Sequence, residues 1–233
     1  MLLKKTTKVL IAVSTYNQAD YFLPYCLRFM QEQTYKNFIC IVGDDRSTDN
    51  TKDIVKALND KRFIYHYTPR KYVLNSYFYN WVAQHYDNKY FITCDGDNFL
   101  LPNHVDRLVS GIGDNVAVYG YANNVVYATD KRTIINQYFR GEPWEINRYI
   151  FGTSYYNFID MSDILFRRKE FIECGGYIEG LRYQDYSIMV RLAIKYNNRI
   201  GYVPEVLTFY SVLHDSQART VDADLESHKN IFI

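Results

Sequence analysis

Short apolar runs alternate along the first half of this chain with segments of helical spacing. Runs of strand length lie at 9–13, 38–42, 63–67 and 90–94. Three of them end abruptly in polar clusters, at 14–17, 44–45 and 95–97. Alternating strands and helices favour a mainly parallel sheet with helices on both faces. Ligands bind at the carboxyl ends of the strands in such sheets, so we expect a site where the polar clusters meet.

Helix boundaries follow from apolar spacing and from candidate capping residues. Leu23, Leu27 and Met30 form a helical stripe that Asp20 is placed to cap, and Ser47 or Thr48 is placed to cap the next helix. Further helices are expected at 75–85, 102–109 and 185–196.

The second half has a weaker pattern. We expect one or two strands in 116–127, no clear period from about 128 to 160, and strands at 164–166 and 203–209. No linker or repeat separates the halves. We therefore expect a single domain over 1–233, with a first half of about 1–110 and a second half of about 111–233.

Composition excludes several classes of protein. The 233 residues carry a net charge of +1 and are 48% hydrophobic, which disfavours disorder and nucleic-acid binding. The cysteines form no C-x-x-C pair and no zinc spacing, so we expect reduced thiols. No apolar run approaches the ~20 residues of a membrane span, and 9–13 is too short for a signal peptide. We expect a soluble, cytoplasmic protein.

Asp95 and Asp97 are the most informative residues of the polar clusters. Gly96 between them lets the backbone turn sharply, so both carboxylates can face one point. Two hard oxygen ligands suit Mg²⁺ or Mn²⁺ that keeps some waters and takes its remaining ligands from a phosphate. Asp-Gly-Asp-Asn is also a good surface turn, so this motif alone leaves the simpler interpretation open.

Other short motifs accompany this one, in a fixed order over about residues 8 to 216. They are Val13-Ser14-Thr15-Tyr16-Asn17, Gln33-Thr34-Tyr35, Gly43-Asp44-Asp45-Arg46-Ser47-Thr48-Asp49, Asp95-Gly96-Asp97, Gly175-Gly176-Tyr177, Gln184-Asp185-Tyr186 with Arg191, and Val203-Pro204-Glu205 leading to His214. In these motifs the chain resembles glycosyltransferase family 2, of the GT-A fold. The resemblance implies a Rossmann-like α/β fold with a smaller acceptor-side subregion. It implies that the half of about 1–110 binds the nucleotide-sugar and that the half of about 111–233 binds the acceptor and carries the catalytic base. It also implies an inverting transferase that uses a nucleotide-sugar, most often a UDP-sugar.

The resemblance assigns donor roles to residues at the strand ends. Ser14 and Tyr16 would hold the nucleoside, and Asp45 would accept a hydrogen bond from the uracil N–H. Asp95 would contact the ribose or a metal-bound water. Asp97 would bind the Mn²⁺ or Mg²⁺ ion that bridges the diphosphate. Structural alternatives remain for two of them, because Tyr16 is also a plausible strand-end aromatic and Asp45 also complements a helix dipole.

Three basic residues are further candidates in the same half-site. Arg70 and Lys71 would approach the phosphate or the base, although an exposed charge pair is the simpler interpretation. His214 matches a histidine that contacts metal or phosphate in the family, although a lone loop histidine is usually solvated. The family usually has an aromatic–arginine pair before this histidine, whereas this chain has Tyr210-Ser211.

Asp185 is the expected catalytic base by resemblance. An inverting enzyme needs a carboxylate that deprotonates the acceptor hydroxyl on the face opposite the leaving group. N-capping of its helix is the structural alternative. The family usually has an acid before the base, whereas this chain has Gln184, a candidate acceptor contact together with Trp144. Trp144 is equally consistent with core or loop packing.

The resemblance points to a sugar acceptor on a surface polysaccharide, glycolipid or glycoprotein. A lipid-linked acceptor would bring the protein into peripheral contact with a membrane. A nucleic-acid base is disfavoured as acceptor by the neutral net charge. Two other classes stay open: a haloacid-dehalogenase-type phosphatase with Asp95 as nucleophile, and a catalytically silent nucleotide-sugar binder, which Gln184 permits. Neither a complete G-x-G-x-x-G motif nor a P-loop is present.

Overall fold

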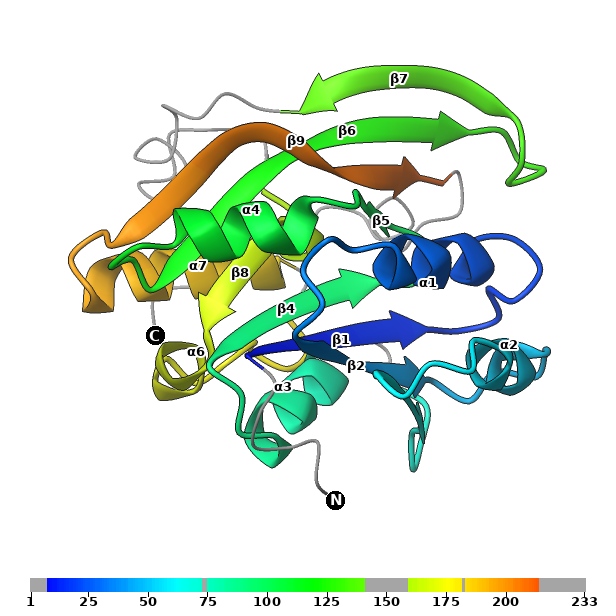
Figure 1. Cartoon of the computed structure of the whole chain (residues 1–233), viewed down its shortest axis with the longest axis horizontal. Helices are drawn as coiled ribbons and strands as arrows, with labels where there is room; N and C mark the ends of the chain where they lie inside the picture. Colours follow the sequence, from blue (N-terminus) through cyan, green and yellow to red (C-terminus); the bar gives the residue numbers. More distant parts are fainter. Residues whose placement is uncertain (1–7, 73–74, 141–158, 182, 214–233) are drawn as a thin grey trace.

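The computed structural model describes residues 8–72, 75–140, 159–181 and 183–213. Its centre is a nine-stranded sheet in the order β3-β2-β1-β4-β8-β6-β9-β5, with β7 paired to β6. Helices cover both faces of the sheet (Figure 1). The predicted α/β fold, a sheet with parallel central strands between two layers of helices, is confirmed.

The first half of the chain forms four parallel strands. They are β1 (Val9–Thr15), β2 (Phe38–Asp44), β3 (Phe63–Tyr67) and β4 (Tyr90–Asp95). β1 lies between β2 and β4, and its Ser14 is in register with Gly43 on one side and Asp95 on the other. The polar ends of the three strands therefore lie at one level along the same edge of the sheet.

Alternate residues of the buried strands pack against different helix layers, as the two-residue period of a strand requires. In β1, Ile11 belongs to one core cluster and Leu10 to the other. The Ile11 face is covered by α1 (Leu23–Gln31), α2 (Thr51–Ala57) and α4 (His104–Gly111). The Leu10 face is covered by α3 (Ser76–His85), α6 (Arg168–Glu173) and α7 (Gln184–Lys195). None of the helices in the described ranges is long and apolar enough to cross a membrane.

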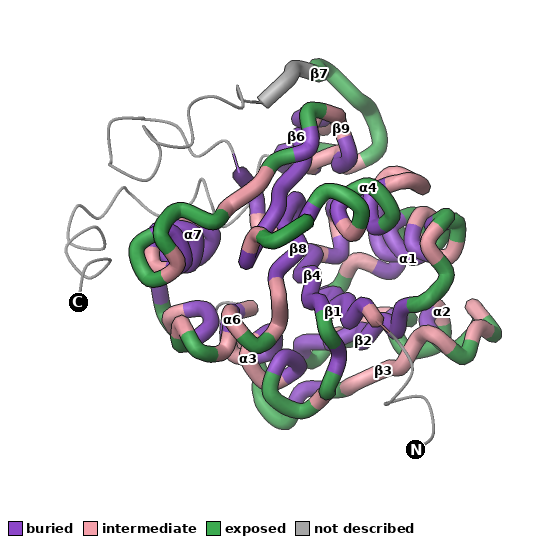
Figure 2. Tube along the Cα trace, turned by 60° about the vertical axis from the view of Figure 1, so that its left-hand side comes forward, coloured by how far each residue is buried: buried purple, intermediate pink, exposed green. Residues whose placement is uncertain are grey.

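The second half completes the sheet with mixed pairing. Its elements are β5 (Phe99–Leu100), β6 (Ala117–Tyr127), β7 (Ile134–Arg140), the 3-10 turn Met161–Asp163, β8 (Ile164–Arg167) and β9 (Ile200–Val212). β8 is antiparallel to both β4 and β6, and β9 runs parallel to β6. The hairpin that joins β6 to β7 stands out from the core as an exposed edge (Figure 2). β9 also pairs with β5, which begins two residues after Asp97.

Two predicted helix caps are wrong. α1 begins at Leu23 without a side-chain cap, because the carbonyl oxygen of Gln18 accepts the N–H groups that Asp20 was expected to serve. α2 begins at Thr51, and the Asp49 side chain accepts its N–H.

The neighbours of Asp49 are used elsewhere in the loop. Ser47 donates its N–H to Asp44, and Thr48 donates its N–H to Asn17. Ser47 and Thr48 therefore hold the strand-end loops together instead of capping a helix.

Several boundaries also differ from the prediction. The 116–127 segment holds one strand, within the predicted one or two, whereas β9 extends beyond the predicted 203–209 on both sides. β5, β7 and α6 were not predicted. The stretch from about 128 to 160, predicted to lack a period, includes β7 and then runs through 141–158, which lie outside the described residues.

Candidate active site

The Asp95-Gly96-Asp97 turn lies at the end of β4 and is held against β1. The Gly96 N–H donates to the carbonyl oxygen of Ser14 at 2.8 Å. A Cβ on Gly96 would lie 3.0 Å from that same oxygen and 2.5 Å from Gln18 Oε1. Only glycine fits so close an approach without displacing its neighbours.

Helix α3 holds the side chain of Asp95. Asn75 Nδ2 donates to Asp95 Oδ1 at 2.7 Å. The Tyr79 hydroxyl lies 2.8 Å from the same oxygen and 2.9 Å from the carbonyl oxygen of Cys94, and its one hydrogen is shared between these two acceptors. Asn75 Oδ1 in turn accepts a hydrogen bond from Ser14 Oγ at 2.9 Å. No described residue donates to Asp95 Oδ2. The carboxylate is therefore anchored through one oxygen, with the other left for a ligand.

Burial, followed by the negative charges of Asp97 and Asp160, raises the pKa of Asp95 to about 8, against the hydrogen bonds from Tyr79 and Asn75. Three carboxylates therefore repel one another in this corner of the fold. Such a group of like charges favours binding of a cation.

The last strand supports the other side of the turn. Ser211 Oγ donates to the carbonyl oxygen of Asp97, and the Ser211 N–H donates to Asn98 Oδ1 at 3.0 Å. Asn98 Nδ2 donates to Ser162 Oγ at 2.9 Å. Asn98 and Ser162 are fully or almost fully buried, so these bonds lie away from water. In the sequence, Ser211 stood out only as the residue at the place where the family usually has an arginine, and Asn98 and Ser162 were missed.

The two carboxylates after β2 have different surroundings. Both oxygens of Asp44 are occupied: Oδ1 accepts from the Ser47 N–H and Oδ2 from the Tyr65 hydroxyl, each at 2.7 Å. Asp45 Oδ1 accepts from the Thr68 hydroxyl at 3.2 Å and from the Tyr72 N–H at 2.9 Å. Asp45 Oδ2 accepts from no described residue. Asp44 is thus a loop anchor, whereas Asp45 keeps one oxygen for a ligand.

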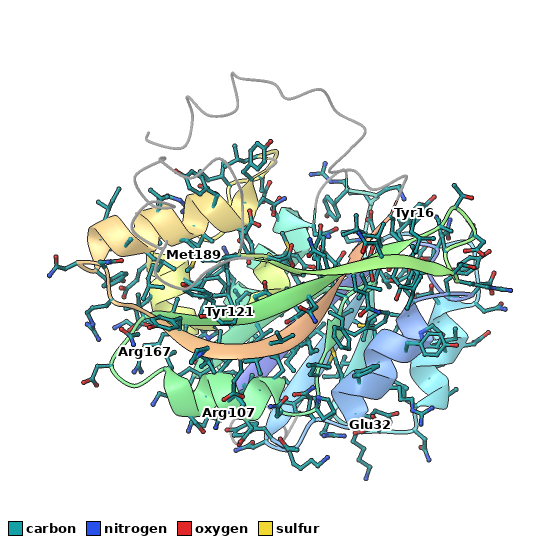
Figure 3. All side chains as sticks on the ribbon, turned by 90° about the horizontal axis from the view of Figure 1, so that it is seen from above. Tyr16, Glu32, Arg107, Tyr121, Arg167 and Met189 are labelled. Carbon is teal, nitrogen blue, oxygen red and sulfur yellow. The ribbon has the colours of Figure 1, made fainter. Side chains whose placement is uncertain are left out.

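The aromatic and basic candidates gather beside Asp45. Tyr16 is 45% exposed at the end of β1, with the Lys71 ammonium over its ring. Figure 3 shows Tyr16 well separated from Tyr121, which packs in the core with α7. Arg70 lies 5.2 Å from the ring centre of Tyr72. The structure therefore brings Tyr16, Arg70 and Lys71 to the same strand-end loops as Asp45, as the sequence predicted.

Asp185 lies in the first turn of α7 and is 7% exposed. It is not the N-cap, which is Tyr183; its Oδ1 accepts instead from the N–H of Tyr186 at 2.8 Å. Gln184 beside it is 3% exposed, and its Oε1 has no hydrogen-bond partner in the structure. A buried amide oxygen without a donor is costly, which makes Gln184 a candidate ligand contact.

Tyr177 is buried beside β4, the strand that carries the Asp-Gly-Asp turn. Its hydroxyl is 2.9 Å from Thr93 Oγ1 on β4. Burial raises the pKa of this hydroxyl well above its usual value, and the charges of Asp185, Asp160 and Asp95 add to the effect. Tyr177 is thus within electrostatic reach of the predicted base and of the turn. The two halves of the candidate site therefore meet around it.

The glycine pair before Tyr177 is held by Arg191 of α7. Its guanidinium donates to the carbonyl oxygens of Cys174 and Gly176. Asn80 of α3 bonds both the N–H and the carbonyl oxygen of Tyr177. The predicted Gly175-Gly176-Tyr177 and Arg191 motifs thus form one structural unit.

The described part of the chain contains no group of three metal-ligating side chains. Asp95 and Asp97 provide two carboxylates, and Asp95 Oδ2 accepts no hydrogen bond there. This set fits Mg²⁺ or Mn²⁺ that completes its shell with water and phosphate oxygens. His214 and Trp144, the remaining predicted contacts, lie outside the described residues.

Comparisons with known proteins agree with the fold. The structure of S. aureus TarS 1-349 in complex with UDP-GlcNAc is similar, with a TM-score of 0.72, 16% sequence identity and coverage of 93% of this chain. The mannosyltransferase PcManGT from Pyrobaculum calidifontis, in complex with GDP-Man and Mn²⁺, has a TM-score of 0.62, 16% identity and coverage of 94%.

At these identities the similarity shows the fold. The chain spans 62% of the TarS 1-349 chain and 59% of PcManGT. No curated protein sequence matches it significantly. The family model described as glycosyl transferase family 2 matches residues 10–175, well over half of the sequence, and the chain therefore belongs to glycosyl transferase family 2.

Proposed function

We propose that this protein is an inverting, metal-dependent glycosyltransferase. It would transfer a sugar from a nucleotide-sugar donor, with a UDP-sugar favoured, to a hydroxyl group of a glycan or glycoconjugate. The observation that carries the proposal is the convergence of Asp45, Asp95 and Asp97 at adjacent strand ends, together with Asp185, whose charge helps to raise the pKa of Tyr177 beside β4. Family membership supports it.

The base-binding part of the donor site is proposed around Asp45. Its Oδ2, which accepts from no described residue, is suited to accept the N–H of uracil, while Oδ1 accepts from the Thr68 hydroxyl and the Tyr72 N–H. The exposed ring of Tyr16 offers a face for stacking on the base. UDP bound to TarS and GDP-Man bound to PcManGT support a nucleotide donor and leave the base to be tested.

Asp95 and Asp97 would hold a divalent ion at the diphosphate. The bound ion would supply Lewis-acid stabilisation of the charge that develops on the leaving nucleoside diphosphate. Arg70 and Lys71 lie in the adjoining loop and would add positive charge toward the same phosphates. Mn²⁺ in the PcManGT complex supports a metal-dependent donor site.

Asp185 is proposed to act as the base. Its carboxylate would accept the proton of the acceptor hydroxyl as that oxygen attacks the anomeric carbon, while the bond from that carbon to the diphosphate oxygen breaks. The N-terminus of α7 favours the ionised carboxylate that this step requires. Gln184, with its unpaired buried oxygen, would accept a hydrogen bond from another acceptor hydroxyl.

Release of UDP from UDP-sugars tests the proposal before an acceptor is known. Many transferases transfer slowly to water, so wild-type protein with Mn²⁺ is expected to release UDP from one sugar of a panel. Asp185→Asn should lower this release by at least about 100-fold, the usual contribution of a general base, and should leave UDP binding intact. Full release by this variant would show that Asp185 is not the base.

Two other outcomes would favour the phosphatase or the silent nucleotide-sugar binder. Phosphate release from a small phosphate ester, with acid-stable labelling of Asp95, would instead indicate a phosphatase. Tight UDP-sugar binding with no release and no transfer to any glycan would indicate a silent binder.

A further inference from the structure

Asn75 occupies an unusual position for an asparagine at the start of a helix. It is the N-cap residue of α3, where an asparagine side chain normally accepts an N–H of the first turn. The Asn75 side chain makes no such capping bond. Its amide instead spans the ends of two strands, between Ser14 on β1 and Asp95 on β4.

The directions of these bonds fix the orientation of the amide. Asn75 Oδ1 accepts from the Ser14 hydroxyl at 2.9 Å, so its Nδ2 must face Asp95 Oδ1, which it contacts at 2.7 Å. Tyr79 lies four residues later on the same face of α3 and donates to that same carboxylate oxygen. One helix thus supplies two donors to Asp95 Oδ1.

Two donors on one oxygen constrain the whole carboxylate. With Oδ1 fixed at 2.7 and 2.8 Å, rotation about the Cβ–Cγ bond is restricted and Oδ2 keeps one direction. No described residue donates to Oδ2. The repulsion between Asp95 and Asp97 would otherwise turn the two carboxylates apart when no cation lies between them.

We propose that Asn75, assisted by Tyr79, is a positioning residue that holds Asp95 Oδ2 toward a divalent cation and its nucleoside diphosphate. This inference rests on the proposed donor site and assigns its preorganisation to the first turns of α3. Preorganised ligands bind more tightly because less order is imposed on binding. Asn75 acts only through Asp95 and is not proposed to touch the nucleotide.

The test separates positioning from general stability by measuring the metal increment. This increment is the ratio of the UDP dissociation constants without and with Mn²⁺, obtained by titration calorimetry on each variant. Asn75→Ala removes the bridging amide and is expected to reduce the increment about tenfold, as loss of a hydrogen bond to a charged group implies. UDP affinity without Mn²⁺ should stay within about twofold, because the pocket around Asp45 is unchanged.

Two further variants complete the test. Tyr79→Phe keeps the ring and removes the second donor to Asp95, together with the bond from the same hydroxyl to the carbonyl oxygen of Cys94. The increment should again fall, and this variant decides the matter if Asn75→Ala does not fold. Asn80→Ala is the matched control: it lies on the same helix, but its amide bonds the backbone of Tyr177. It should lower the midpoint of thermal unfolding (Tm) and leave the increment unchanged.

The outcomes are distinguishable. If wild-type protein shows a metal increment and both Asn75→Ala and Tyr79→Phe retain it in full, the positioning role is wrong and the donor site stands. If Asn80→Ala lowers the increment as much as Asn75→Ala, α3 acts only through stability and the inference is overturned. If wild-type protein binds no UDP with Mn²⁺, both the inference and the proposed donor site fail.

Discussion

Ser211, near the end of the last strand, donates its hydroxyl hydrogen to the main-chain oxygen of Asp97 in the Asp-Gly-Asp turn. More than a hundred residues separate the two in sequence. The backbone N–H of Ser211 binds Asn98 as well, so β9 holds two successive residues of the turn. The backbone of Asp97, the proposed metal ligand, is therefore held by β9, the last strand of the described chain.

Ser211→Ala should loosen the turn without unfolding the protein. The hydroxyl bond to Asp97 is lost and the N–H bond to Asn98 remains, so about 0.5–1.5 kcal/mol of stability is expected to go. Metal-dependent UDP binding should weaken by roughly 2- to 10-fold, measured by titration calorimetry. Ser110→Ala, on the exposed face of α4, is the matched control and should change neither quantity. Unaltered binding in Ser211→Ala would show that β9 does not position Asp97.

Gly96→Ala tests the close approach of β4 to β1. The added Cβ would lie 3.0 Å from the backbone oxygen of Ser14, which cannot move without disturbing the β1–β4 ladder. Overpacking of this kind costs ~1–3 kcal/mol, so Tm should fall by roughly 3–10 °C. Metal-dependent UDP binding should fall with it. A variant with wild-type Tm and affinity would contradict the proposed tight contact.

The raised pKa of Asp95 predicts a pH dependence of stability in the absence of metal. The folded protein keeps a proton on Asp95 up to about pH 8, whereas the unfolded chain loses it near pH 4. The folded state therefore binds more protons in this window, and its stability should fall as pH rises from about 4 through about 8. Below about pH 6.5 the buried His104 acts in the opposite sense, so the comparison is made between about pH 6.5 and 8, where thermal unfolding should show this fall in wild type and not in Asp95→Asn. The same slope in both proteins would mean that another group is responsible.

Mn²⁺ binding should depend on pH in the opposite sense. A cation at Asp95 displaces its proton, so the apparent affinity should rise as pH increases toward about 8 and level off above it. Calorimetry in buffers of different ionisation enthalpy would detect the released proton at pH 7. Binding that releases no proton would place the ion away from Asp95.

The buried His104 should make the protein less stable toward unfolding at acid pH. It is fully buried on α4, its Nδ1 bonds the carbonyl oxygen of Leu207, and burial lowers its pKa to about 4. The unfolded chain takes up this proton near pH 6.5, so stability should be lost as pH falls from about 6.5 through about 4. The full loss is on the order of 3 kcal/mol. Measured in Asp95→Asn, which lacks the opposite slope of Asp95, His104→Gln should flatten this dependence on pH in urea unfolding curves; an unchanged slope would assign it to other groups.

The sequence predicted the buried strands well because each is a continuous apolar run that cannot be exposed to water. It missed β7, whose Ile134 and Ile135 are both exposed and therefore lack the alternation that marks a half-buried strand. It also misplaced the cap of α1, since the acceptor at that helix start is a main-chain carbonyl, that of Gln18. Every residue has a main-chain carbonyl oxygen, so the sequence does not show which one accepts the hydrogen bonds at a helix start.

The residues of the candidate site were also predicted only in part. Asp45, Asp95 and Asp97 were identified because carboxylates at strand ends are visible in the sequence. Asn75 and Tyr79 were missed, because their contacts with Asp95 span 20 and 16 residues and depend on how α3 packs. An asparagine that leaves its own helix uncapped would have been the signal, and it is recognisable only in the structure.

The most direct test of the account is the binding of UDP, GDP, dTDP and CDP to wild type and Asp97→Asn, each with and without Mn²⁺, by titration calorimetry. The account predicts that one nucleotide, UDP before the others, binds wild type at least about tenfold more tightly with Mn²⁺ than without it. Asp97→Asn, with its fold verified by Tm, should lose this difference. Binding that ignores both Mn²⁺ and Asp97, or no binding of any nucleotide, would contradict a metal-dependent donor site at these strand ends.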